Sequence, residues 1–156
     1  QRRLELQLSL TDQVTLLPNV KELLESLRID GFRIALATMS SGDVVQHIMS
    51  FHGIGHYFDH VVTVDDVVNV KPDPEILVKT IALLGVNAEQ ALYCGDSSHD
   101  SEAAFRLGMP FLLINSGLYV RGEALQELLL SVEHRGCPVI GLEDMLNIRN
   151  VINQIS

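Results

Sequence analysis

The chain alternates between charged amphipathic segments and short apolar runs, and a glycine marks most of the boundaries. The segment Val20–Ile29 shows the pattern first: three leucines share one helical face, and charged residues fill the other face. Gly31 follows, and glycine readily adopts the left-handed conformation in which many helices end. The run Arg33–Thr38 comes next, with the length and apolar content of a buried strand. The pattern predicts a repeated cycle of helix, turn and strand.

The same cycle continues to the end of the chain. The predicted strands are Arg33–Thr38, Val61–Val64, Ala91–Gly95, Pro110–Ile114 and a short one at Pro138–Ile140. The predicted helices are Val20–Ile29, Asp43–Phe51, Pro74–Leu84, Ser98–Leu107, Glu123–His134 and Leu142–Ile155. The strands are apolar along their whole length rather than at alternate positions, so helices should cover both faces of a parallel sheet. The sequence therefore predicts an α/β fold, a doubly wound parallel sheet with flanking helices.

Residues 1–17 depart from this cycle, and we predict that they are separate from an α/β core at residues 18–156. The leucines between positions 4 and 10 alternate as in a strand. Leu6, Leu10, Val14 and Leu17 also share one helical stripe, so periodicity alone allows both structures. Of the two, we predict a helix.

Composition narrows the class of protein. With 156 residues, 47% of them hydrophobic, the chain is long enough to bury one sizeable core. Its 11 Lys and Arg against 20 Asp and Glu give a net charge of −9, opposite in sign to a surface that binds nucleic acid. Every apolar run is far shorter than the ~20 residues of a membrane-spanning helix. We therefore expect no nucleic acid and no membrane among its partners.

Two sequence details bear on cellular context. Cys94 and Cys137 are too few for a disulfide framework, and each has the apolar neighbours of a reduced core cysteine. A cytoplasmic protein is the prediction. The sequence starts at Gln1 rather than at a methionine, and we expect further residues upstream.

Polar residues collect where the predicted strands end. Thr38-Met39-Ser40-Ser41 follows the first strand, Asp65-Asp66 and then Lys71 follow the second, and Gly95-Asp96-Ser97-Ser98-His99-Asp100 ends the third. The carboxyl ends of parallel strands meet at one edge of a sheet, where α/β proteins bind ligands. There, a hydroxyl and helix N-terminal amides can bind phosphate oxygens, an ammonium can neutralise them, and carboxylates can hold Mg²⁺. The set indicates phosphate chemistry.

These residues also have structural interpretations. Thr38 and Ser40 can cap the following helix, because Ser and Thr are favoured at helix N-termini. Asp96 and Asp100 can be an N-cap and a first-turn carboxylate stabilised by the helix dipole. Asp73 precedes a proline suited to a first helical position, and we assign it a capping role. For the other four, the residues alone leave both interpretations open.

Taken in order, three elements resemble the motifs of the haloacid dehalogenase superfamily: the strand ending at Thr38, then Lys71-Pro72-Asp73-Pro74-Glu75, then Gly95-Asp96-Ser97-Ser98-His99-Asp100. The resemblance is to the phosphoglycolate phosphatase and β-phosphoglucomutase-like branch, and it covers Leu17–Asn115 most closely. It implies a Mg²⁺-dependent phosphatase that acts on a small phosphorylated metabolite. It also makes residues 1–17 the remnant of a helical cap.

The resemblance assigns roles to individual residues. Thr38 and Lys71 are the predicted catalytic residues: Thr38 would bind the transferring phosphoryl group, and Lys71 would neutralise it. Met39 belongs to the same phosphate-binding loop, although Asn or Ser is commoner there in the family. Asp96 would ligate Mg²⁺, and Asp100 would support the metal site.

One family element is not found in this sequence. The attacking carboxylate of the family lies in an Asp-x-Asp-Gly-Thr element on a first strand, whereas Asp65-Asp66 lacks that spacing and follows a different strand. Without that strand and most of the cap, we expect the chain to be inactive alone. We also expect exposed sheet edges through which copies form a homo-oligomer. The alternative function is a non-catalytic module that keeps the fold and serves in binding or interaction.

Overall fold

The computed structural model describes residues 14–118 and 120–155. The strands in this part of the chain are β1 (Ala35–Ala37), β2 (His60–Val62), β3 (Tyr93–Gly95), β4 (Phe111–Asn115) and β5 (Val139–Gly141). The α-helices are α2 (Val20–Ile29), α3 (Gly42–His52), α4 (Glu75–Leu84), α5 (Ser98–Arg106), α6 (Gly122–Glu133) and α7 (Ile148–Ile155). Short 3₁₀ helices are η1 (Gly55–Tyr57), η2 (Val64–Asp66), η3 (Ala88–Gln90) and η4 (Leu142–Asn147). The predicted alternation of helix and strand is confirmed.

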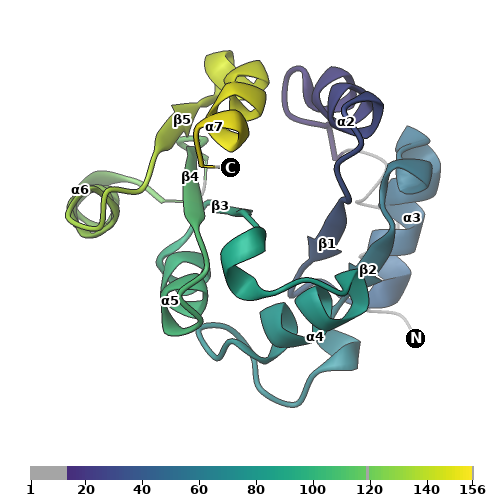
Figure 1. The fold of residues 1–156 in the computed structure, drawn as a ribbon, viewed down its shortest axis with the longest axis horizontal. Coiled ribbons are helices and arrows are strands. Elements are labelled where there is room, and N and C mark those ends of the chain that lie inside the picture. The colour runs from purple at the N-terminus through teal and green to yellow at the C-terminus, as the bar shows by residue number, and fades with distance from the viewer. Residues whose placement is uncertain (1–13, 119, 156) are drawn as a thin grey trace.

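The strands form parallel sheets with helices around them, as predicted, but the sheet is divided in two. β1 pairs with β2, and β4 lies between β3 and β5. Figure 1 shows β1 and β3 facing each other across the centre of the molecule, with the helices on the outside. Among the described residues no strand pairs β1 with β3, which agrees with the exposed sheet edges expected from the family strand that the sequence lacks.

We call the facing edges of β1 and β3 the seam. In the part of the chain that the structure describes, β1 pairs only with β2, and β3 pairs only with β4. All residues of these two strands are only half-buried, whereas Phe111, Leu112 and Leu113 of β4 are at most 1% exposed. Solvent therefore reaches the two strands that border the seam.

Strand β4 is apolar at every position but its last because helices cover both faces of its sheet. Phe111 and Leu113 belong to a core cluster that also contains Ile76 of α4. Leu112 points the other way and belongs to a second cluster with Leu23 of α2. Because successive strand residues face opposite sides, helices pack on both faces of this sheet.

The end of the chain differs from the predicted helix Leu142–Ile155. The structure has the 3₁₀ segment η4 followed by α7. Met145 and Ile148 are both buried in the second core cluster. Residues three apart superpose in a 3₁₀ turn, so this geometry places both side chains in the core. The helix predicted over 1–17 falls largely outside the described residues, and described residues 14–17 are not helical.

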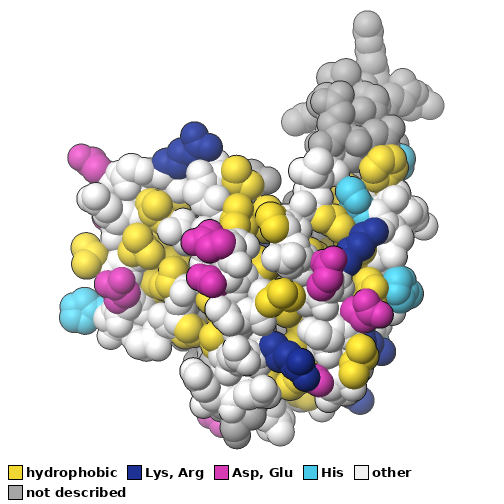
Figure 2. Space-filling view, turned by 90° about the horizontal axis from the view of Figure 1, so that it is seen from above, with side chains coloured by type: hydrophobic (Ala, Val, Ile, Leu, Met, Phe, Trp, Pro, Cys, Tyr) yellow, Lys and Arg dark blue, Asp and Glu magenta, His cyan; other side chains and the backbone are white. Residues whose placement is uncertain are grey.

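The surface of the described part is mixed in character. Figure 2 shows one face, on which Lys and Arg side chains are separated by acidic and hydrophobic ones. No helix among the described residues has the length and apolar content needed to span a bilayer.

Candidate active site

Lys71 contacts strands on both sides of the seam. Its Nζ donates hydrogen bonds to the Ala37 carbonyl of β1, at 3.3 Å, and to the Tyr93 hydroxyl of β3, at 2.7 Å. It also lies 2.8 Å from Asp100 Oδ1, and the two charged side chains are only 8% and 10% exposed. All three N–H groups of the ammonium thus have an acceptor. The structure brings together two of the predicted site residues, Lys71 and Asp100.

Asp100 is fixed by the turn at the start of α5. Its Oδ2 accepts hydrogen bonds from Ser97 Oγ at 2.7 Å, from Ser97 N at 3.2 Å and from Asp96 N at 3.3 Å. Ser97 is the N-cap and Asp100 completes a capping box. Gly95 is required for this approach, since a Cβ there would lie 2.5 Å from the Asp100 Cβ. The alternative N-cap prediction for Asp96 is wrong, whereas Asp100 is both a first-turn carboxylate and the partner of Lys71.

The two carboxylates of this turn have opposite pKa shifts. Burial alone would raise the pKa of Asp100, but hydrogen bonds from Lys71 and Ser97 outweigh it and the pKa falls below its usual range. Burial raises the pKa of Asp96, and the neighbouring charge of Asp100 raises it further. Asp96 has no ion-pair partner among the described residues. The Lys71 charge offsets only part of these effects, so Asp96 is the less compensated carboxylate of this turn.

Thr38 and Met39 follow β1 directly. The Thr38 N–H donates to the Val62 carbonyl of β2 at 3.0 Å, so sheet pairing fixes the start of this loop. Thr38 Oγ1 accepts a 3.2 Å hydrogen bond from Ser40 N. The Met39 side chain packs against the first core cluster. A phosphate role for Met39, which stays a prediction, would therefore use its backbone N–H.

The start of α3 is held by a residue that the sequence analysis left without a role. The N-cap position is Ser41, so the capping interpretation of Thr38 and Ser40 is wrong. Asp65 Oδ2 instead accepts a 2.8 Å hydrogen bond from Gly42 N. The carboxylate lies at the positive end of the helix dipole, where negative charge is stabilised. Asp65 thereby ties the loop after β1 to the end of β2.

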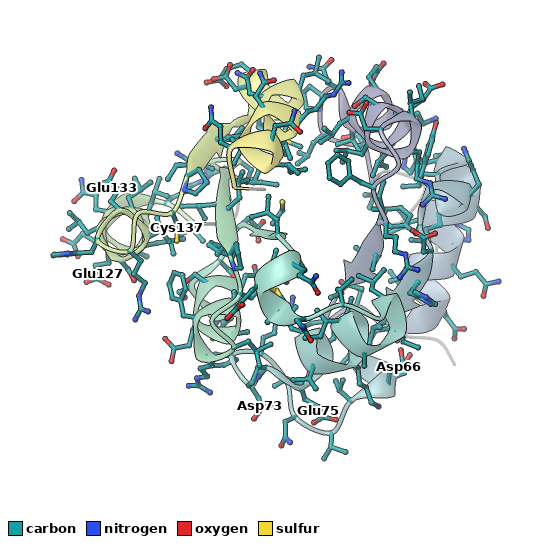
Figure 3. The ribbon with its side chains drawn as sticks, viewed as in Figure 1. Asp66, Asp73, Glu75, Glu127, Glu133 and Cys137 are labelled. Carbon is teal, nitrogen blue, oxygen red and sulfur yellow. The ribbon has the colours of Figure 1, made fainter. Side chains whose placement is uncertain are left out.

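Other acidic residues close to Lys71 in the sequence have structural roles. Asp73 Oδ1 accepts a 3.0 Å hydrogen bond from Glu75 N, the first residue of α4, but the N-cap position is Pro74, so the predicted placement of Asp73 at the N-cap is wrong by one residue. Glu75 accepts hydrogen bonds from Val68 N and Asn69 N and orders that loop. Asp66 completes a capping box at η2. Figure 3 shows Asp66, Asp73 and Glu75 together around α4, in the lower part of the view.

The donor set fits a Mg²⁺ ion that is held mainly by one carboxylate. Mg²⁺ in phosphate-handling sites usually has one or two carboxylate ligands and completes its shell with water and substrate oxygens. Asp96 is half-buried, has a raised pKa and has no ion-pair partner among the described residues, so a bound cation would stabilise its charge. Asp100 already accepts five hydrogen bonds, and we assign it to holding Lys71 and the turn. The described residues contain no group of three or more acidic, His or Cys side chains around a common point.

Two hollows lie near these elements. The larger, about 520 Å³, is bordered by α3, η1 and β2 and is lined by residues such as Val45, Met49 and His56. It includes no predicted site residue. A smaller one beside Asp96, too narrow to hold a water molecule, is lined by Asn115 and Ser116, at the end of β4. The smaller hollow is the one that belongs to the candidate site.

Sequence comparison then decides the family. The family model described as haloacid dehalogenase-like hydrolase matches residues 2–114. The chain belongs to this family. The resemblance stated from the three motifs is thus confirmed, and the family accounts for the Lys71 and Gly95–Asp100 elements at the strand ends.

Named family members are similar over much of the chain. Phosphoglycolate phosphatase from Yersinia pseudotuberculosis is 34% identical over 131 residues, which are 84% of this chain and 54% of that protein. Pyrophosphatase PpaX from Halalkalibacterium halodurans is 34% identical over 104 residues, 67% of this chain and 47% of that protein. The chain therefore spans about half the length of the curated relatives that it matches.

The fold is likewise that of known family structures. A candidate β-phosphoglucomutase from Thermotoga maritima superposes with a TM-score of 0.72 at 30% identity. The match covers 85% of this chain and 59% of that one. This agreement confirms the α/β fold with parallel strands and flanking helices, and the phosphoglycolate phosphatase and β-phosphoglucomutase-like branch.

Sequence analysis missed three polar residues at the site. The role of Ser97 could have been predicted, because Ser-x-x-Asp at a helix start is close to the capping-box pattern. The sequence gives a weaker indication for Asp65, which is a carboxylate at the end of a predicted strand. No sequence pattern indicates the role of Tyr93, since a tyrosine inside an apolar strand suggests core packing and not a contact with Lys71.

Proposed function

We propose that the full-length protein is a Mg²⁺-dependent phosphatase that acts on a small phosphorylated metabolite. The observation that carries the proposal is the buried Lys71–Asp100 pair beside Asp96, a half-buried carboxylate without an ion-pair partner among the described residues. A fixed ammonium and a cation-binding carboxylate are the groups that neutralise a phosphoryl group during transfer. The names of the Yersinia and Halalkalibacterium relatives support a phosphatase.

We place the nucleophilic carboxylate on a strand that occupies the seam. The family resemblance puts this carboxylate in an Asp-x-Asp element, which the printed sequence lacks. A strand between β1 and β3 would join the two parallel sheets and would end beside Lys71, which already contacts Ala37 of β1 and Tyr93 of β3. It would also cover strands that are otherwise half-buried.

The reaction then proceeds in two displacement steps. A carboxylate oxygen attacks phosphorus, and the bond from phosphorus to the substrate oxygen breaks as that oxygen takes a proton from solvent. Water next attacks the phosphorus of the acyl phosphate, which releases inorganic phosphate and restores the carboxylate. When bound, Mg²⁺ would supply positive charge to the phosphoryl oxygens at Asp96.

Lys71 and Thr38 stabilise the charge on the phosphoryl group. The Lys71 hydrogen bond to the Ala37 carbonyl is the longest of its three, at 3.3 Å. We propose that this donor is redirected to a phosphoryl oxygen, while the bonds to Tyr93 and Asp100 hold the ammonium in place. The Thr38 hydroxyl accepts only from Ser40 N among the described contacts, so its proton can be donated to phosphate.

The test is phosphate release by the full-length protein with phosphoglycolate, pyrophosphate and a hexose phosphate, with and without Mg²⁺. We expect Mg²⁺-dependent release from at least one of them. Asp96→Asn should abolish it, whereas Asp144→Asn, which changes an exposed carboxylate on η4, should not. Absence of Mg²⁺-dependent hydrolysis with every substrate would refute the proposal and favour the non-catalytic interaction module.

The proposal extends to cellular context. Cys94 and Cys137 are free thiols in the structure, in keeping with a reducing compartment, and we propose the cytoplasm. The net charge of −9 and the separated basic side chains on the face in Figure 2 argue against nucleic acid as a partner.

A further inference from the structure

Tyr93 lies at the junction of the core and the candidate site. It is the first residue of β3 and pairs in register with Phe111 of β4. Its ring also packs near the Phe111 ring, with the ring centroids 6.0 Å apart. Sheet pairing and ring packing together fix where the hydroxyl lies.

The hydroxyl bridges the two charged side chains of the site. Lys71 Nζ donates to Tyr93 Oη at 2.7 Å, and Tyr93 Oη donates to Asp100 Oδ1 at 2.8 Å. The ammonium also lies 5.4 Å from the centre of the Tyr93 ring, within the range of a cation–π contact. Burial raises the pKa of Tyr93, so the phenol keeps the proton that it donates.

The position of this hydroxyl restricts the lysine. A lysine ammonium is a compact charge on a flexible stem, so a single carboxylate partner leaves its other N–H groups free to turn. Here each of the three N–H groups of the ammonium has its own acceptor: Asp100 of α5, Tyr93 of β3 and Ala37 of β1. Ala37 offers a backbone carbonyl of β1, and Tyr93 is held by sheet pairing and ring packing. Of the three acceptors described, the tyrosine is the one that belongs to the sheet of β3.

We propose that Tyr93 is a positioning residue that fixes the Lys71 ammonium at the seam, in the orientation needed to meet a phosphoryl group. It acts through Lys71 and does not itself touch the substrate. The catalytic consequence rests on the proposed phosphatase function. The fixed orientation of Lys71 does not depend on that proposed function, and it can be measured separately.

The experiment compares Tyr93→Phe with the matched control Tyr57→Phe in the full-length protein. Tyr57 lies on η1, whereas the hydrogen bonds and the cation–π contact described for Lys71 are with Ala37, Tyr93 and Asp100. The loss of one hydrogen bond to a charged group should lower kcat roughly tenfold to a hundredfold in Tyr93→Phe and leave KM nearly unchanged. Replacement of Tyr93 by 4-aminophenylalanine, which restores a polar group at the same place, should recover much of the lost rate.

A second readout does not require activity. The rate at which Lys71 is acylated by an amine-reactive ester, followed by peptide mass spectrometry, should rise several-fold in Tyr93→Phe and stay unchanged in Tyr57→Phe. Equal acylation and equal kcat in Tyr93→Phe and wild type would overturn the inference. Loss of folding in Tyr93→Phe alone, seen by circular dichroism, would also overturn it in favour of a purely structural role. Inactivity of the wild type would refute the phosphatase proposal, while the acylation rates would still decide the role of Tyr93.

Discussion

Asp96 and Asp100 lie in one turn but respond to pH in opposite directions. The pKa of Asp100 is lowered in the folded state, so its contribution to stability is complete above its unfolded value near 3.8 and is lost as the pH falls through the folded value. The pKa of Asp96 is raised, so the folded protein loses stability as the pH rises from about 3.8 through the folded value. The difference arises from partners, because Lys71 and Ser97 donate to Asp100.

Substitution of each carboxylate by asparagine should therefore have opposite effects at neutral pH. Asp100→Asn leaves the buried Lys71 ammonium without its counter-charge and should lower the free energy of unfolding by about 3 kcal/mol. Asp96→Asn removes a charge that burial and the neighbouring Asp100 destabilise, and it should raise the free energy of unfolding in metal-free buffer. Urea unfolding of both variants measures the two changes. The same sign for both would contradict the assignment.

Mg²⁺ should cancel the higher stability that Asp96→Asn has in metal-free buffer. An ion that binds only the folded protein raises its stability by mass action. The melting temperature of the wild type should therefore increase with Mg²⁺ concentration, and that of Asp96→Asn should not. An equal increase in both proteins would place the metal elsewhere.

Packing against Asp100 explains why the motif has a glycine at position 95. A Cβ at this position would lie 2.5 Å from the Asp100 Cβ, closer than such atoms approach. Gly95→Ala should cost roughly 1–3 kcal/mol of stability and displace Asp100 from Lys71. Gly42→Ala is the control, because a Cβ there would meet its nearest atom at an ordinary 3.5 Å. Equal stability of the two variants by thermal unfolding would argue against this explanation.

At the scale of elements, periodicity predicted most of the helices well. Helix α2 has the predicted bounds, because its three leucines are buried on one face and its charged residues lie on the other. Predicted site residues Lys71 and Asp100 meet because parallel strands end at one edge of a sheet. Exposed strand edges were predicted from the family strand that the sequence lacks. The bridging by Tyr93 was not predictable, since it depends on which strands lie side by side. The roles of Thr38, Met39, Lys71, Asp96 and Asp100 in catalysis remain predictions.

The seam should also be visible in strand dynamics. β4 pairs on both edges and is fully buried over Phe111–Leu113, whereas β1 and β3 each pair on one edge and are half-buried. Amide hydrogens of β1 and β3 should exchange with solvent faster than those of β4 in the printed 156-residue chain. In the full-length protein, a strand in the seam should slow the exchange of both. Unchanged exchange between the two proteins would mean that the seam stays open.

At the scale of the whole molecule, the seam is also the edge through which we predict self-association. Unpaired edges of parallel strands offer N–H and C=O groups to another chain. Sedimentation of the 156-residue chain should show an average mass that rises with concentration. The full-length protein, with a strand in the seam, should not show this rise. A constant monomer mass for the shorter chain would contradict the prediction.

The central claim is transfer of a phosphoryl group to a carboxylate beside Lys71 and Asp96, and acid quenching tests it most directly. The full-length protein is mixed with labelled substrate and Mg²⁺, quenched in acid during turnover, and split into peptides. We predict label on an Asp-x-Asp peptide upstream of Gln1, released by hydroxylamine as an acyl phosphate is, and strongly reduced in Lys71→Met. Rapid hydrolysis with no label on the protein, or with label on any other residue type, would contradict the account.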